Sequence, residues 1–375
     1  MKRATIKDVA IRAGVSISLV SKIVNAPRDG DGLPVCKVRE DTLRRVLEAI
    51  NVLGYRPNRA AASLRRGKEN RIGIILPDIS NRFFADLSRD IENIAYANGF
   101  TVIFGSSDEN PDKLGNLLDS LTSDGVDGLI VIPCCGCENC IRRIADTGTP
   151  IVIAVRDLPS IGNIGRVLDD SVTATQLALD HLVGSGYRAI EMVSPSMRLS
   201  NVIEREDLYE SYMKSHSLGG FIKVNHVDDN DKETSSRFIL EDCVRRGVQA
   251  LYFPCASLPL IFLTEATSLG LKIPDDIAIF GYDGGKDYLI TNPTISQIMY
   301  SRKEMAESAF NMLCRMMDGG PVPETVNLKP SLATGGSTAI PDASGAQNPD
   351  DLLATLTETI RSLNKTIIKL KQNEQ

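Results

Sequence analysis

The sequence predicts an α/β protein with an all-α N-terminal head, a core of two parallel-sheet subdomains and a C-terminal coiled-coil helix. Within residues 1–70, apolar residues recur at helical spacing. Between residues 71 and 340, short apolar runs alternate with helical stretches, a pattern typical of parallel strands joined by crossover helices. Beyond residue 350, leucine and isoleucine follow a heptad pattern.

The head begins with two short predicted helices. Thr5 and Asp8 have the spacing of a capping box, and Gly14 is placed to end the first helix. Ser16 can cap a second helix whose apolar side includes Val20 and whose outer side carries Ile17, Ser18, Ser21, Lys22 and Asn25. Two helices of this length with a short turn between them are typical of a helix-turn-helix motif. A third amphipathic helix follows and stops near residues 54–55, before Pro57.

Charge is distributed unevenly along the chain. Residues 1–70 contain 15 Lys and Arg against 7 Asp and Glu, a net charge of +8, whereas the remainder carries −14. Clustered cations neutralise phosphates, so this asymmetry suggests that only the head binds a polyanion. Composition alone does not distinguish this from a charged, soluble N-terminal domain.

The core is predicted from strand-sized apolar runs. They span residues 72–76, 101–104, 128–132, 151–155, 190–193, 250–253 and 277–280. This many strands indicates two α/β subdomains that face a cleft, and ligands bind beyond the carboxyl ends of such strands. The candidate pocket therefore lies in the segments that follow the strands.

The first seventy residues resemble the head and hinge of the LacI (lactose repressor) family. The resemblance rests on TIKDVAIRAGVSISLVSKIVN and, after a loop longer than is usual in the family, on VLEAINVLGYRPNRAAASLRRGKENRIGIILP. It implies a DNA-binding head at 1–57, a hinge helix and linker at 58–70, and sequence-specific binding of a dimer to double-stranded operator DNA. The residues that it assigns to DNA binding are Thr5, Ser16, Ile17, Ser18, Ser21, Lys22, Asn25, Asn58, Leu64 and Arg65.

Individual roles follow from the same resemblance. Ile17, Ser18 and Lys22 would address base edges, with Lys22 donating to guanine, while Ser16, Ser21 and Asn25 would hold phosphates. Leu64 would wedge into the minor groove and kink the duplex, a role we favour over packing beneath the core.

The core resembles the periplasmic-binding-protein-like core of the same family. The resemblance implies an N-subdomain at about 71–168 plus 299–325 and a C-subdomain at about 169–298 plus 326–340. A small-molecule effector, sugar-like in the usual member, would bind between them. Its predicted contacts are Phe83, Phe84, Cys134, Arg198, Ser200, Arg205 and Asp283. The pair Cys255-Ala256 stands where the family usually has Asn-Asp, which argues against an ordinary sugar.

The eight cysteines leave alternatives open. Cys134, Cys135, Cys137 and Cys140 form a cluster that could bind soft metal, form a disulfide or start a helix with a lowered thiol pKa. The cluster lacks the second ligand pair of a zinc site, so we favour neutral packing and expect no metal or cofactor. A thiol oxidoreductase using Cys137 and Cys140 is the rival function. Because no phosphate loop, nucleophile elbow or metalloprotease motif occurs, we expect a protein that is not an enzyme.

The remaining expectations concern location and assembly. No signal peptide or membrane-length apolar run is present, which predicts a cytoplasmic, nucleoid-associated protein without membrane contact and disfavours a solute-binding transport protein. Residues 341–349 are predicted to form a linker. Residues 350–375 carry the seam Leu353, Leu356, Ile360, Leu363, Ile367 and Leu370, which favours a homodimer that pairs into a dimer of dimers through 350–372 over a helix docked on its own core.

Overall fold

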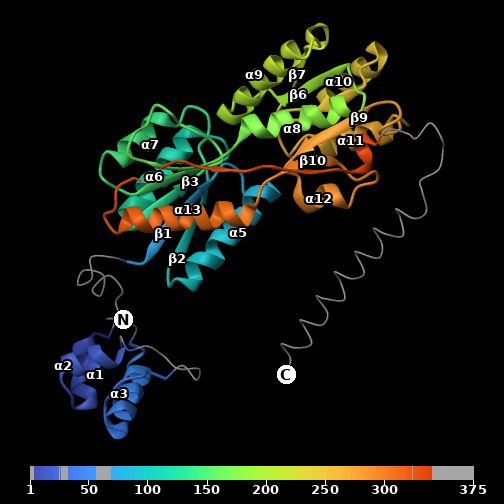
Figure 1. Ribbon diagram of the computed structural model, residues 1–375. Coiled ribbons are helices and arrows are strands. Elements are labelled where there is room, and N and C mark those ends of the chain that lie inside the picture. Colours follow the sequence, from blue (N-terminus) through green and yellow to red (C-terminus); the bar gives the residue numbers. More distant parts are fainter. Residues whose placement is uncertain (1–3, 25, 27–32, 56–68, 323, 340–375) are drawn as a thin grey trace. The chain divides into compact units, whose positions relative to one another are not determined.

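The computed structural model describes residues 4–24, 26, 33–55, 69–322 and 324–339 (Figure 1). The chain forms two compact units: residues 1–71 with 125–127, here called the head, and the remaining chain, here called the core. The predicted hinge helix at 58–66, with Asn58, Leu64 and Arg65, lies outside the described residues, as do Asn25, the linker at 341–349 and the oligomerisation helix at 350–375.

The head contains the three predicted helices, α1 (Ile6–Ala13), α2 (Ile17–Val24) and α3 (Glu40–Leu53). The capping box is confirmed, because the Thr5 hydroxyl accepts from the Asp8 backbone while the Asp8 carboxylate accepts from the Thr5 N–H at 2.8 Å. Gly14 ends α1 with φ +63°, a conformation that only glycine adopts at no steric cost. A small apolar core joins the helices, centred on Val9, Val20 and Val46.

The first sheet of the core has strand order β11-β5-β4-β3-β1-β2. Its strands are β1 (Arg71–Leu76), β2 (Thr101–Ser106), β3 (Gly128–Val131), β4 (Ile151–Ala154), β5 (Gly165–Asp169) and β11 (Val326–Leu328). The pairs β1/β3, β3/β4, β4/β5 and β5/β11 are parallel. Four helices cover this sheet: α5 (Arg82–Ala97), α6 (Pro111–Ser123), α7 (Glu138–Ala145) and α13 (Arg302–Met317). Figure 1 shows α5 and α13 side by side, and these two helices pack together.

The second sheet has strand order β12-β10-β9-β8-β6-β7. Its strands are β6 (Ile190–Pro195), β7 (Val224–Val227), β8 (Ala250–Tyr252), β9 (Ala278–Tyr282), β10 (Ser296–Met299) and β12 (Ser331–Ala333). β12 runs antiparallel to β10, whereas the other pairs are parallel. The helices of this half are α8 (Ser171–Gly184), α9 (Ser200–Ser215), α10 (Lys232–Arg246), α11 (Pro259–Ser268) and the short α12 (Gly285–Leu289), with 3-10 turns at Gly219–Phe221 and Gly336–Thr338.

The chain passes between the two halves three times. The passages lie between β5 and α8, between β10 and α13, and between β11 and β12. The third is later than the sequence predicted, because residues 326–328 form β11 and pair with β5 of the first sheet through Asn327 and Leu168. One apolar core continues through both halves, from Phe310 on α13 to Tyr209 on α9.

No helix within the described ranges is both long enough and apolar enough to span a membrane.

Candidate functional site

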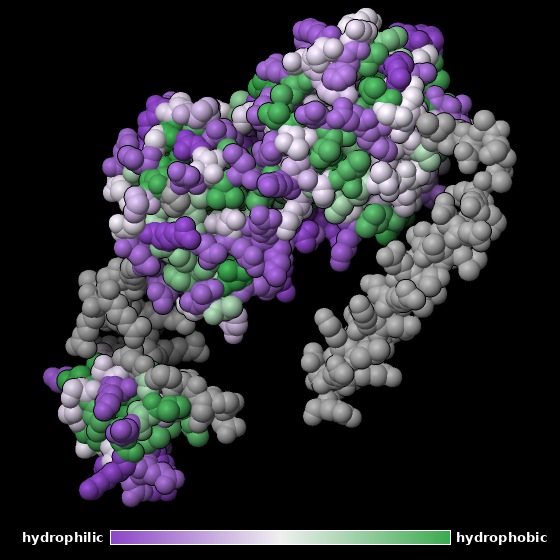
Figure 2. Space-filling view, viewed as in Figure 1, coloured by the Kyte–Doolittle hydropathy of each residue, from purple (hydrophilic) through white to green (hydrophobic). Residues whose placement is uncertain are grey.

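The outer face of α2 is the candidate nucleic-acid interface. Ile17 is 47% exposed, although it is an apolar residue on a short helix, and Ser18 and Lys22 are also exposed. Figure 2 shows hydrophobic residues at the surface of the head among many hydrophilic ones. Val20 and Ile23 are buried on the opposite side of α2, so packing of the head leaves the outer side free for a partner.

Several predicted DNA-binding side chains also hold the local structure. The Ser16 hydroxyl accepts from the Leu19 N–H at 3.2 Å, as an N-cap does, and lies 2.9 Å from the Ser18 hydroxyl. The Thr5 hydroxyl donates to Asp8 at 2.7 Å. Ser21 is partly buried. DNA contact by these residues stays a prediction, but their positions fix the start and orientation of both helices.

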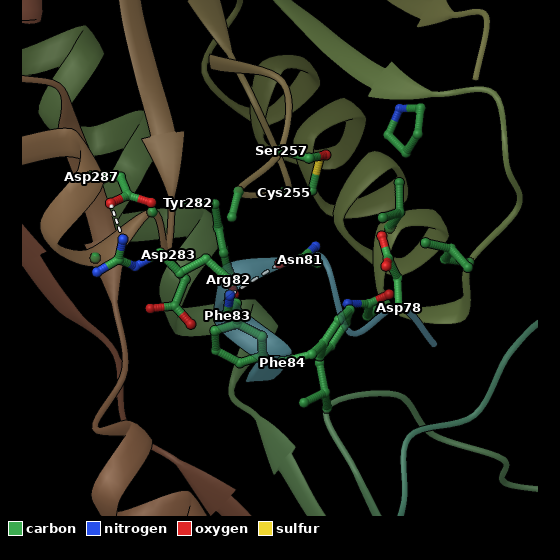
Figure 3. Close-up of a pocket in the computed structure, with 18 of the residues that line it drawn as sticks. Asp78, Asn81, Arg82, Phe83, Phe84, Cys255, Ser257, Tyr282, Asp283 and Asp287 are labelled. Atoms are coloured by element: carbon green, nitrogen blue, oxygen red, sulfur yellow. Dashed lines mark hydrogen bonds and ion pairs between the residues drawn. The ribbon is translucent and has the colours of Figure 1, made fainter. Parts of the chain in front are cut away.

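The core contains a cavity of about 470 Å³ lined by both halves. Residues from the first half include Asn81, Arg82, Phe83, Phe84, Glu109, Arg156 and Asp169, and those from the second include Asn201, Arg205, Cys255, Ser257, Tyr282, Asp283 and Asp287. Figure 3 shows Phe83, Phe84, Tyr282, Asp283 and Cys255 around this space. Most of these residues follow the carboxyl ends of strands or begin helices, the usual ligand position in such folds.

Arg205 on α9 forms a buried ion pair at the base of the cavity. Its Nη2 donates to Asp169 Oδ2 at 3.0 Å and its Nη1 donates to the Pro254 carbonyl at 2.6 Å. The guanidinium lies over the Tyr282 ring, 3.8 Å from its centre. Burial raises the pKa of Asp169 to about 6, because the charged carboxylate is costly to hold away from water even beside Arg205.

Asp283 follows β9 and is held in a strained backbone conformation with φ +49°. Its N–H donates to the Ile298 carbonyl at 2.7 Å. The flanking glycines are required by packing, since a Cβ at Gly281 or Gly284 would lie 2.3 or 2.1 Å from the Tyr288 ring. Burial, and then the nearby charge of Asp169, raise the pKa of Asp283 to about 7.

Two further ion pairs border the cavity. Arg156 binds Glu109 with two hydrogen bonds of 2.8 Å and lies 5.7 Å from the centre of the Phe84 ring. Arg82 at the start of α5 lies 3.3 Å from Asp287 of α12 (Figure 3), so this pair joins the two halves.

The predicted effector contacts divide into two groups. Phe83, Phe84, Arg205 and Asp283 line the cavity, whereas Cys134, Arg198 and Ser200 are not among the residues that line it. Ser200 and Arg198 are exposed, and Arg198 pairs with Glu206 at 2.8 Å. On α9 the cavity face is instead formed by Asn201, Val202 and Arg205, which helical periodicity places together.

The cysteine cluster forms neither the disulfide nor the metal-binding group that the sequence left open as alternatives. All eight cysteines are free, and no group able to hold a metal ion occurs within the described ranges. Cys137 is the N-cap residue of α7, and its pKa is raised, not lowered as one of the alternatives required, mainly because its thiol hydrogen-bonds to Cys134 and is buried. The pKa of Cys140 is raised as well, by burial, and its Sγ donates to the Cys137 carbonyl at 3.0 Å. Raised thiol pKa values disfavour a nucleophilic thiolate at either residue.

Sequence reasoning missed much of the polar lining. After β4 it is Arg156 that lines the cavity, whereas the carboxylate of the neighbouring Asp157 accepts from Arg166 at 2.9 Å. Glu109, the partner of Arg156, lies 47 positions away in the sequence, and no local pattern predicts that pair. Arg156 could have been predicted as a cavity residue, because it too directly follows a predicted strand.

Three family models match the chain. The model for bacterial regulatory proteins of the lacI family covers residues 5–58, that for periplasmic binding proteins and the sugar binding domain of the LacI family covers 69–240, and that for a periplasmic binding protein-like domain covers 179–338. Together they extend over the head and both halves of the core.

Curated relatives and solved structures agree with these models. Catabolite control protein A of Priestia megaterium is 29% identical over 321 residues, which are 84% of this chain and 92% of that protein. The transcriptional repressor PurR of Histophilus somni is 28% identical over 336 residues, 88% of this chain and 97% of that protein. The fold is similar to that of a Lac repressor dimer bound to operator and an anti-inducer, with a TM-score of 0.76, 20% identity, and coverage of 90% of this chain and 100% of that one.

Proposed function

The chain belongs to the LacI family of bacterial transcriptional regulators, and we propose that it represses transcription by binding operator DNA under the control of a small molecule in its cleft. The observation that carries this proposal is the head. The family model over residues 5–58 coincides with three packed helices whose second helix leaves Ile17, Ser18 and Lys22 exposed. A helix of this kind presents side chains to the base edges of the major groove.

Control by a ligand is supported by the origin of the cavity residues. Phe83, Phe84 and Asp169 belong to the first half of the core, and Arg205 and Asp283 belong to the second. A ligand that contacts both halves changes the free-energy difference between two relative orientations of the halves. If the ligand thereby changes the affinity for operator, operator must change the affinity for the ligand by the same factor. The effector that we propose is a small polar molecule of sugar-like size.

Assembly and location are also part of the proposal. Relatives of this family include a Lac repressor dimer bound to operator, which supports a homodimer on a pseudo-palindromic site. Pairing of two dimers through residues 350–372 rests on the heptad pattern alone. A DNA-binding regulator of this family is expected to act in the cytoplasm, at the nucleoid.

The test uses the full-length chain and a pool of random duplexes. Repeated selection should enrich a two-fold symmetric sequence, and the selected duplex should bind far more tightly than random duplex at equal salt. The matched variants are Lys22→Ala on α2 and Lys7→Ala on α1, both at exposed lysines. We expect Lys22→Ala to cost about 1–3 kcal/mol and to relax base preference at one position per half-site.

Lys7→Ala serves as the control for loss of charge alone. It should leave the selected sequence unchanged while removing the same positive charge. Failure to enrich any symmetric sequence, or identical base preferences for both variants and the unaltered chain, would refute recognition through α2.

A further inference from the structure

The charge at the base of the cleft limits what its ligand can be, given the proposed function. Arg205, Asp169 and Asp283 together carry one positive and two negative charges when ionised. Arg205 is 2% exposed and already paired with Asp169 at 3.0 Å. Within the described part of the chain, Asp283 takes part in no ion pair, so one negative charge at this place lacks a cation.

The other cations of the cavity lie beside carboxylates of their own. Arg156 is held by Glu109, Arg82 by Asp287, and Arg302 by Asp86 at 3.1 Å and by Asp90 at 2.7 Å. Lys232 lies 4.0 Å from Asp229. Lys286 is exposed to solvent. An anionic ligand would therefore meet arginines whose charge is already neutralised, and would raise the local charge from −1 to −2.

Unpaired buried atoms give a second, independent indication. The Asp169 side chain is 5% exposed, yet its Oδ1 has no hydrogen-bond partner. Arg205 Nε is likewise buried and unpaired, as is Asn201 Oδ1. Buried polar groups without partners are costly, and at a cavity wall they mark where a ligand supplies the missing donor or acceptor. Two acceptors and one donor therefore await a ligand here.

We propose that the cleft binds a cationic amine that carries an oxygen acceptor on a neighbouring carbon, as in an amino alcohol or an amino sugar. The ammonium group donates to Asp283 and to Oδ1 of Asp169, and the oxygen accepts from Nε of Arg205. The apolar face of the ligand packs against Phe83 and Phe84, whose rings meet edge to face at 5.3 Å.

The loop after β8 fits this ligand better than it fits a neutral polyol. Cys255 and Ala256 present an apolar wall, and Ser257 is the one hydroxyl-bearing residue on that loop segment that lines the cavity. A neutral polyol would leave the charge of Asp283 uncompensated. The pKa of Asp283, raised to about 7, and that of Asp169, raised to about 6, are consistent with a site that takes up a proton when no cation is present.

The experiment compares ligands that share one skeleton and differ in charge, using full-length protein at about pH 8, where Asp283 is mostly ionised. One set is phenylglycinol, its diol analogue phenylethylene glycol, and mandelate. The second set is D-glucosamine, D-glucose and D-glucuronate. Thermal unfolding and operator affinity are measured in the same samples, because a ligand of the folded state raises Tm. We expect at least one amine to raise Tm and alter operator affinity more than both of its partners do.

The variants Asp283→Asn and Asp146→Asn make the test specific. Asp146 is an exposed carboxylate at the end of α7, away from the residues that line the cavity. Asp283→Asn should weaken amine binding by about ten- to hundredfold, the value of a hydrogen bond to a charged group, whereas Asp146→Asn should leave it unchanged. Three results would each overturn the proposal. The protein could bind the neutral or the anionic partner more tightly than the amine, it could bind neither amine, or Asp283→Asn could bind the amine as tightly as the native chain does. Operator binding that responds to a neutral sugar would overturn it while leaving the proposed function intact.

Discussion

Replacing Asp283 with asparagine is expected to make the folded core more stable at alkaline pH. In the native chain this carboxyl is held beside Asp169, away from most water, and its pKa is raised from 3.8 to about 7. Asparagine has nearly the same shape and carries no charge, so it removes the cost of the carboxylate without leaving a cavity.

The magnitude follows from the pKa. One pKa unit corresponds to about 1.4 kcal/mol, so the displacement of the Asp283 pKa gives an upper bound of about 4 kcal/mol. Because Asp283 is half-buried, screening by water reduces this, and we expect a gain of about 2–3 kcal/mol in the free energy of unfolding. For a unit of this size the gain corresponds to an increase of about 5 °C in Tm.

The sign of the pH dependence is fixed by the direction of the shift. Below about pH 4, Asp283 is protonated in both the folded and the unfolded chain, so the carboxylate costs nothing. Between about pH 4 and 7 the unfolded chain releases a proton that the folded chain retains, and stability falls as pH rises. Above about pH 7 the loss is complete, and Asp169 contributes in the same direction up to about pH 6.

The assay is thermal unfolding at about pH 5 and pH 8, and it compares the Tm of the native chain with that of Asp283→Asn and of the control Asp146→Asn. The Tm of Asp283→Asn should exceed that of the native chain at the higher pH and approach it at the lower. An Asp283→Asn variant that is less stable than the native chain by the same amount at both pH values would refute the reasoning, since it would show that the carboxylate is structurally required.

Three further predictions concern the hinge, the C-terminal segment and the cysteines. Leu64→Ala, in the predicted hinge helix, should weaken binding to operator more than binding to random duplex, as measured by fluorescence titration, because a wedge acts only where DNA can be kinked; equal losses would argue against the wedge. Deleting residues 350–375 should reduce a tetramer to a dimer in light scattering with single-operator affinity retained, and an unchanged mass would mean that the helix binds its own subunit. Replacing five cysteines with serine should leave operator affinity and metal content unchanged; the positions are Cys134, Cys135, Cys137, Cys140 and Cys255. Tightly bound metal that is lost on these substitutions would establish a metal site instead.

The sequence predicted most of the interior strands but only one of the four edge strands. Seven predicted runs correspond to β1, β2, β3, β4, β6, β8 and β9. The strands that were not predicted are β7, β11 and β12, which lie at the edges of their sheets, and β5 and β10, which lie in the interior; the edge strand β2 was predicted. An edge strand has a neighbour on one side only, so it can carry polar residues such as His226 on β7 and Asn327 on β11 without burying them. Without a continuous apolar run, such strands give little signal in the sequence.

The residues that line the cleft were predicted less completely than the strands. Phe83, Phe84, Arg205 and Asp283 line the cavity because each follows a strand or occupies the cavity face of a helix. Cys134 also follows a strand, but it is 3% exposed and lies next to Pro133, whose carbonyl accepts from Arg156. Whether a residue after a strand points into the cleft or into the core depends on loop conformation, which local sequence does not determine.

Two ion pairs connect the halves of the core beside the cleft. Arg205 of the second half is bound to Asp169 of the first, and Arg82 of the first half is bound to Asp287 of the second. These pairs lie at a cavity whose lining residues carry unpaired hydrogen-bonding atoms. A ligand that satisfies those atoms stabilises one spacing of the halves, whereas a ligand that competes for Arg205 or Asp169 removes a connection between them.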